Sequence, residues 1–159
     1  MATIIPNNCY DVVVKYWLLA KSIWVSFMPE LKIHQGSCHC GAIKFEIDAP
    51  ADLHAHACNC SICSISGSDQ MIIPSSRFRL HSGEDAITTY QFNTNVAQHT
   101  FCQYCGVKPF YTPRSNPDGF SVNTRCLDRT YINSIVVDVF DGQNWEKNAA
   151  SLAHLSKEK

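Results

Sequence analysis

The chain has 159 residues, a length typical of one domain and sufficient to bury about 70% of the unfolded surface without disulfides. Hydrophobic residues make up 45% and charged residues 17%, which excludes a largely disordered protein. Lys and Arg number 13 against 14 Asp and Glu, so the net charge is −1. A net charge this close to zero produces no positive electrostatic field that would attract nucleic acid or an anionic membrane. Direct nucleic-acid binding is therefore not predicted.

The predicted elements begin with an apolar extension, residues 1–27, outside a core domain of residues 28–159. Residues 12–28 are apolar and aromatic, but Lys15 and Lys21 interrupt them, so no run of about 18 apolar residues is available to span a bilayer. The chain start carries no positive charge of the kind that a signal peptide needs. Three interpretations stay open for the extension: a helix that is packed or docked on a partner, a loosely ordered segment, or a membrane-surface anchor.

Beyond the extension, turns separate short strand-like segments at residues 42–47, 71–73, 78–80, 87–92, 107–112 and 135–140. The first segment alternates, with Ile43, Phe45 and Ile47 on one face, as in a half-buried strand. Pro109 has no backbone N–H group, so its segment is predicted at a sheet edge or a bulge. Apolar residues recur at helical spacing over 145–155. The predicted fold class is therefore mainly β with a short C-terminal helix.

The nine cysteines carry the clearest chemical signal in the sequence. Seven fall into three tight groups, at positions 38 and 40, at 58, 60 and 63, and at 102 and 105, while Cys9 and Cys126 stand alone. An odd number cannot pair completely, and cysteines this close in sequence bridge poorly through the geometry that a disulfide needs. Metal ligands or redox pairs are the better interpretation. Reduced thiols in turn predict an intracellular location, in the cytoplasm or the nucleus.

The first and third groups share a pattern in which two cysteines on a tight turn are followed at once by a glycine. Gly41 and Gly106 can adopt a positive φ, which turns backbone N–H groups toward the sulfur atoms. Two such turns can supply four thiolates in a tetrahedron around Zn²⁺. A structural zinc site is therefore predicted on Cys38, Cys40, Cys102 and Cys105. The alternatives are two unrelated pairs of buried thiols, or a redox pair.

The second group places three sulfur atoms within a few residues, on Cys58, Cys60 and Cys63. Three protein ligands and one open position are typical of a catalytic zinc, whose open position can take a thiolate or a polarised carbonyl. These cysteines are therefore predicted to form a reactive zinc site. Together with the structural site, this predicts two zinc ions per chain. The alternative is a closed, structural site whose fourth ligand is Cys126, His56 or His99.

Three cysteine-containing motifs together resemble one known family. They are Gly36-Ser37-Cys38-His39-Cys40-Gly41, Cys58-Asn59-Cys60-Ser61-Ile62-Cys63 and Phe101-Cys102-Gln103-Tyr104-Cys105-Gly106. Over residues 33–147 the chain resembles the glutathione-dependent formaldehyde-activating family, and within it is most similar to centromere protein V. The resemblance implies a zinc-bearing β-tent fold of folded antiparallel sheets. It also assigns the structural and the reactive zinc to the same two sets of cysteines.

The resemblance further implies an activity on a small thiol adduct. Members of the family are described as joining glutathione to formaldehyde, which gives S-hydroxymethylglutathione and is classed as a carbon–sulfur lyase activity. Glutathione or a similar thiol would then bind at the second zinc. Centromere protein V has a basic, disordered N-terminal region, whereas the extension here is short and apolar, so a centromeric role is not carried over.

Candidate substrate contacts are Asn123, Arg125 and Arg114, because arginine forms bidentate pairs with carboxylates such as those of glutathione. The alternative to substrate binding is a structural role, in surface ion pairs for the two arginines and in a turn for the asparagine. Two other functions remain open for the whole chain. One is a non-catalytic zinc interaction module, and the other is a metal-chaperone or redox-sensing role through a labile second zinc.

Overall fold

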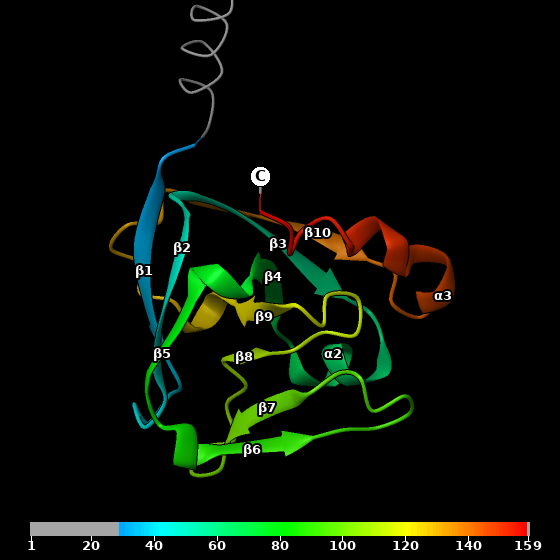
Figure 1. The fold of residues 1–159 in the computed structure, drawn as a ribbon, viewed down its shortest axis with the longest axis horizontal. Helices are drawn as coiled ribbons and strands as arrows, with labels where there is room; N and C mark the ends of the chain where they lie inside the picture. Colours follow the sequence, from blue (N-terminus) through cyan, green and yellow to red (C-terminus); the bar gives the residue numbers. More distant parts are fainter. Residues whose placement is uncertain (1–28, 159) are drawn as a thin grey trace, which may run out of the picture. The chain divides into compact units, whose positions relative to one another are not determined.

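The computed structural model describes residues 29–158, so the extension predicted at residues 1–27 lies outside the described residues. Within the described part, ten strands form three sheets (Figure 1). None of the helices described there is both long and apolar enough to cross a membrane.

The first sheet has the strand order β1-β2-β5, with β1 (Leu31–Ser37), β2 (Lys44–Pro50) and β5 (Phe78–Ser82). The second has the order β10-β3-β4-β9-β8, formed by β10 (Ser134–Phe140), β3 (Asp52–Cys58), β4 (Asp69–Pro74), β9 (Gly119–Asn123) and β8 (Phe110–Tyr111). The third pairs β6 (Ile87–Tyr90) with β7 (His99–Cys102). Helix α2 (Ser61–Ser66) follows β3, and α3 (Trp145–Asn148) follows β10. Short 3₁₀ turns are η1 (Ser75–Arg77), η2 (Glu84–Ala86), η3 (Thr124–Cys126) and η4 (Ala149–Leu152).

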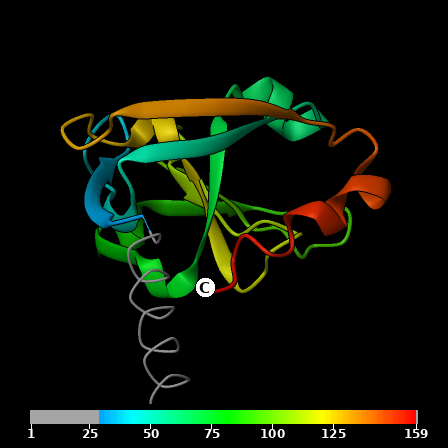
Figure 2. The ribbon, with the colours of Figure 1, turned by 90° about the horizontal axis from the view of Figure 1, so that it is seen from above.

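The predicted mainly β class with a short C-terminal helix is confirmed, but one strand pair departs from the expected antiparallel arrangement. β10 runs parallel to β3, alongside it in Figure 2, with Ser134 opposite Asp52 and Phe140 opposite Cys58. The chain between these strands passes through the rest of the second sheet, and such a long connection allows a parallel pair. The parallel register brings the turn after β10 to the end of β3 that carries Cys58.

The alternating pattern of the first predicted strand is confirmed. Ile43, Phe45 and Ile47 are at most 1% exposed, and Phe45 contacts the ring of Phe110 from β8, with 5.3 Å between centroids. The Phe78 ring stacks on Phe120 of β9 at 4.2 Å. These rings join the first sheet to the second. β8 is a two-residue edge strand directly after Pro109, as predicted for that segment.

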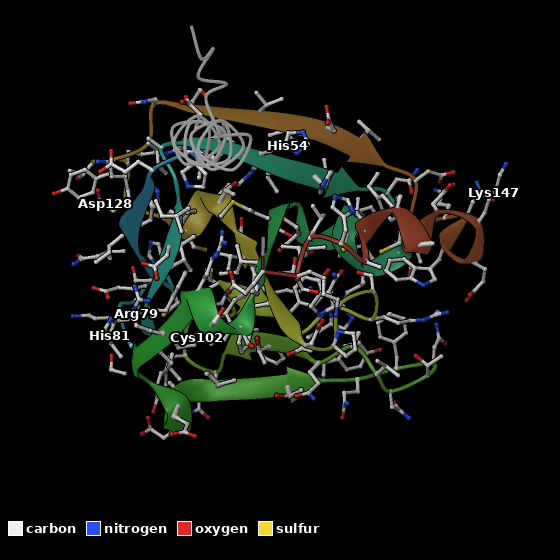
Figure 3. All side chains as sticks on the ribbon, turned by 45° about the horizontal axis from the view of Figure 1, so that its top comes forward. His54, Arg79, His81, Cys102, Asp128 and Lys147 are labelled. Atoms are coloured by element: carbon white, nitrogen blue, oxygen red, sulfur yellow. The ribbon has the colours of Figure 1, made fainter. Side chains whose placement is uncertain are left out.

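The outer face of the first sheet carries its charged side chains. Arg79 makes two parallel hydrogen bonds to Asp48, at 2.7 and 2.8 Å, and both Arg79 and His81 contact Glu46 (Figure 3). Arg79 lowers the pKa of Asp48 through these hydrogen bonds. The pattern of apolar residues inside and paired charges outside orients this sheet in the fold.

The C-terminal helix is shorter than the predicted span 145–155. After α3 the backbone changes to 3₁₀ spacing, with Ala153 N–H donating to Ala150 O at 3.3 Å. The side chain of Asn116 donates to the carbonyl of Leu152 at 3.0 Å, a tertiary bond that the periodicity of the segment does not reveal. This bond fixes the end of the 3₁₀ segment against the loop that contains Asn116.

Candidate metal centres and thiol site

The first and third cysteine groups meet in space. The sulfur atoms of Cys38, Cys40, Cys102 and Cys105 lie within 4.8 Å of one another, and the separations Cys38–Cys40 and Cys40–Cys102 are both 3.6 Å. Four ligands at about 2.3 Å from a tetrahedral zinc are about 3.8 Å apart, whereas a disulfide bond is about 2.05 Å. The group therefore fits a tetrahedral metal ion and is not a pair of disulfides.

Backbone N–H groups support this four-sulfur group in the way that the glycine pattern predicted. Gly41 and Gly106 have φ of +76° and +70°. Ile43 N–H donates to Cys38 Sγ at 3.3 Å, and the backbone at Val107 and Cys40 lowers the pKa of Cys105 to about 6. Cys102, in the interior in Figure 3, is fully buried. The group links the β1–β2 turn to the end of β7. A metal ion bound there would join these two parts of the fold, as structural sites do.

The second group gathers at the junction of β3 and α2. Cys58 ends β3, Cys60 is the N-cap residue of α2, and Cys63 lies in that helix, with all three sulfur atoms within 4.8 Å of one another. Cys60 N–H donates to Cys58 Sγ at 3.5 Å, and the Cys58 and Cys63 thiols lower the pKa of Cys60. The three sulfurs are thus arranged so that they could share one metal ion.

The turn after β10 fixes the backbone of the second group. Asn59 accepts from Gln143 N–H at 2.9 Å and donates to Asp141 at 3.2 Å, and its own N–H donates to Phe140 O at 3.1 Å. A Cβ atom at Gly142 would lie 2.4 Å from Cys58 Sγ. Only glycine allows this close approach, so Gly142 belongs to the site as much as the cysteines do.

A cavity of about 370 Å³ opens over the second group. Its walls include the three cysteines, the rings of Phe92, His99, Tyr111 and Trp145, and the guanidinium of Arg114. By contrast, Cys38 and Cys102 of the first group are buried. The two cysteine groups therefore differ in their surroundings: all three cysteines of the second group line this cavity, whereas in the first group only Cys40 is exposed.

His99 is the central ring of one cavity wall. It stacks between Phe92 at 5.3 Å and Tyr111 at 5.0 Å. Burial, and then the charge of Lys108, lowers the pKa of His99 to about 4, so the ring is neutral near pH 7. Lys108 Nζ donates to His99 Nδ1 at 3.0 Å, which leaves the ring proton on Nε2.

Known proteins resemble this chain in sequence and in fold. Residues 33–142 match the family described as glutathione-dependent formaldehyde-activating enzyme. The chain belongs to this family. A solved structure of a Rhodobacter sphaeroides protein is 32% identical, covers 67% of this chain and 99% of its own, and superposes with a TM-score of 0.57.

In this formaldehyde-activating family member, only one of the three candidate substrate contacts reaches the cavity. Arg114 lines it, pairs with Glu146, and lies 5.4 Å from the centre of the Trp145 ring. Asn123 instead donates to Lys108 O at 3.3 Å and accepts from the backbone of Arg125, inside the β8–β9 region. Arg125 Nε pairs with Asp69 at 2.7 Å, outside the cavity. The structure thus separates Asn123 and Arg125 from the second cysteine group.

None of the three suggested fourth ligands joins the second group among residues 29–158. Cys126 lies on η3, where burial and then the nearby Cys38 and Cys105 raise its pKa to about 11, so its neighbours belong to the first group. His56 lies on β3 beside His54, with 5.1 Å between ring centroids. His99 lines the cavity but its ring nitrogens stand outside the sulfur cluster. The described residues therefore supply three donors at this site.

Sequence reasoning did not identify several residues of the cavity. Gly142 and Trp145 line the cavity but are not among the predicted site residues. One feature of the sequence could have marked Lys108: it is a charged residue between Val107 and Pro109 in a segment predicted as a strand. Nothing in the sequence placed it behind the wall that faces the second cysteine group.

Proposed function

We propose that the protein joins glutathione to formaldehyde in the cavity over Cys58, Cys60 and Cys63. The sulfur of glutathione bonds to the carbon of formaldehyde, and the thiol proton ends on the carbonyl oxygen, which gives S-hydroxymethylglutathione. This is a carbon–sulfur lyase type of activity. The observation that supports it most is a three-sulfur group on an open cavity, in a chain of this family.

The proposal assigns two zinc ions to the two cysteine groups. The four sulfurs of the first group match a closed, structural site. Zinc held by Cys58, Cys60 and Cys63 would stabilise a thiolate and polarise a carbonyl oxygen. Soft thiolate ligands favour zinc over hard cations such as Mg²⁺ or Ca²⁺.

The chain's own residues would bind and orient the reactants. Arg114 is placed to bind a glutathione carboxylate, in exchange for its pairing with Glu146. The rings of Phe92 and Trp145 give the cavity an apolar wall. Neutral His99 offers its Nε2–H as a donor for the oxygen atom that receives the thiol proton. Burial keeps the Tyr111 hydroxyl protonated, since it raises the pKa of that group.

Binding of glutathione to the zinc-loaded protein tests the site. By isothermal titration calorimetry, we expect Arg114→Gln to weaken binding about tenfold or more, because a charge-assisted carboxylate contact is lost. Arg125→Gln is the matched control and should bind as the wild type does, since Arg125 pairs with Asp69 away from the cavity. A wild-type protein that carries both metals and ignores glutathione would contradict the proposal and favour a non-catalytic zinc module.

Turnover needs a separate measurement, because thiols and formaldehyde condense without a catalyst. Exchange NMR with ¹³C-formaldehyde gives the rate at which S-hydroxymethylglutathione forms and breaks down. The rate should rise in proportion to wild-type protein and stay at the uncatalysed value with Cys60→Ser. Equal rates for the two proteins would mean that the protein binds the thiol but does not catalyse the reaction.

A further inference from the structure

Lys108 is a half-buried cation behind the cavity wall. Its Nζ donates to His99 Nδ1 at 3.0 Å and lies 4.2 Å from the centre of the Tyr111 ring, and both of these residues line the cavity. No carboxylate forms an ion pair with it among residues 29–158. The position of the ammonium is therefore determined by a neutral ring nitrogen and an aromatic face.

A partly desolvated ammonium is costly without a negative partner. The groups that face the Lys108 ammonium are His99 from β7, Tyr111 from β8, and the three sulfurs from β3 and α2, while the Asn123 amide from β9 donates to the Lys108 backbone carbonyl. Of these groups, His99 is neutral and Tyr111 protonated. Burial lowers the pKa of Lys108, while Cys63, Cys60 and Cys58 raise it. Lys108 contacts two residues of the cavity wall that also contains the three cysteines, so their thiolates are the negative groups on that side of it.

Charge counting shows what this cation does for a bound ligand. A divalent ion with three thiolates has a net charge of −1, and a fourth thiolate makes it −2. A neutral ligand leaves the charge at −1. A nearby ammonium therefore stabilises the thiolate complex more than the complex with a neutral ligand.

We infer that Lys108 is a positioning residue that supplies the counter-charge of the second cysteine site and makes that site prefer an anionic thiolate over a neutral ligand. This inference rests on the proposed function, and it adds a determinant of ligand charge that acts from behind His99 and Tyr111. The selectivity is for ionised thiols as a class, since Lys108 senses the charge on sulfur and not the peptide attached to it.

Two ligands that differ only at sulfur test the inference. Glutathione can bind as a thiolate, whereas S-methylglutathione keeps the peptide contacts and cannot ionise at sulfur. For Lys108→Met we expect glutathione affinity at pH 7 to fall about tenfold or more, with S-methylglutathione affinity changed less than about threefold. The pH midpoint of glutathione binding should rise by about one unit. Lys108→Arg should recover most of the loss.

The controls separate a charge effect from a structural one. Lys44→Met removes an exposed lysine on β2 and should change neither affinity. Metal content and thermal unfolding are measured for every variant, and Lys108→Gln serves as a second neutral substitution if methionine disturbs packing. Equal losses for both ligands, or unchanged glutathione binding in the neutral variants, would overturn the inference alone. Wild-type protein that binds no glutathione would overturn the proposed function, and this inference with it.

Discussion

Cys38→Ser is expected to unfold most of the chain. Cys38 is 1% exposed and belongs to the four-sulfur group that links the β1–β2 turn to β7. A structural zinc site contributes about 10–16 kcal/mol at neutral pH, which is comparable to the whole stability of a domain, about 5–15 kcal/mol. Loss of one ligand also leaves the buried Cys102 and the half-buried Cys105 without their ion. We therefore expect insoluble protein with little bound zinc.

Cys126→Ser is the matched control for this prediction. Cys126 is a half-buried cysteine that belongs to neither sulfur group. Its replacement should cost only about 1–2 kcal/mol and leave the metal content unchanged. Soluble yield, zinc by elemental analysis and thermal unfolding monitored by circular dichroism compare the two variants. Soluble, native-like Cys38→Ser protein would show that the first group does not hold the fold together.

Gly142→Ala is expected to disable the second site while the fold survives. The added Cβ would lie 2.4 Å from Cys58 Sγ and 2.9 Å from Cys60 Cβ, so both cysteines must move. Metal sites tolerate little displacement, since even changes around the ligands cost about 10–100-fold in affinity. We expect the bound zinc to fall from two ions to one, and glutathione binding to be lost.

Gln143→Ala provides the comparison for the glycine substitution. Gln143 is the next residue in the same turn, and its contact with Asn59 uses its backbone N–H, which alanine retains. This variant should keep both metals. Because Gln143 also lines the cavity, zinc content is the quantity compared between the two variants. Two zinc ions and unchanged glutathione binding in Gly142→Ala would mean that the turn after β10 does not set the position of the second cysteine group.

Each correct prediction about the fold came from a pattern of residues that are close in sequence. The alternation around Phe45 and the position of β8 after Pro109 follow from the pattern of side chains along a strand and from a missing N–H group. The short C-terminal helix was predicted, but not the bond to its last turns from Asn116, which lies in the loop before β9. The parallel β10–β3 pair was not predicted, because its two strands are distant in sequence.

The sequence by itself determined the ligand chemistry of this protein. Cysteine spacing within each group, and a glycine after each of the two pairs, specify turns that present sulfur atoms, since both are properties of a few consecutive residues. Tertiary structure alone decided that Arg114 reaches the cavity over the second group while Arg125 pairs with Asp69. Contacts such as Gly142 against Cys58, or Lys108 behind His99, join strands whose pairing depends on burial of the whole core, and no local pattern encodes them.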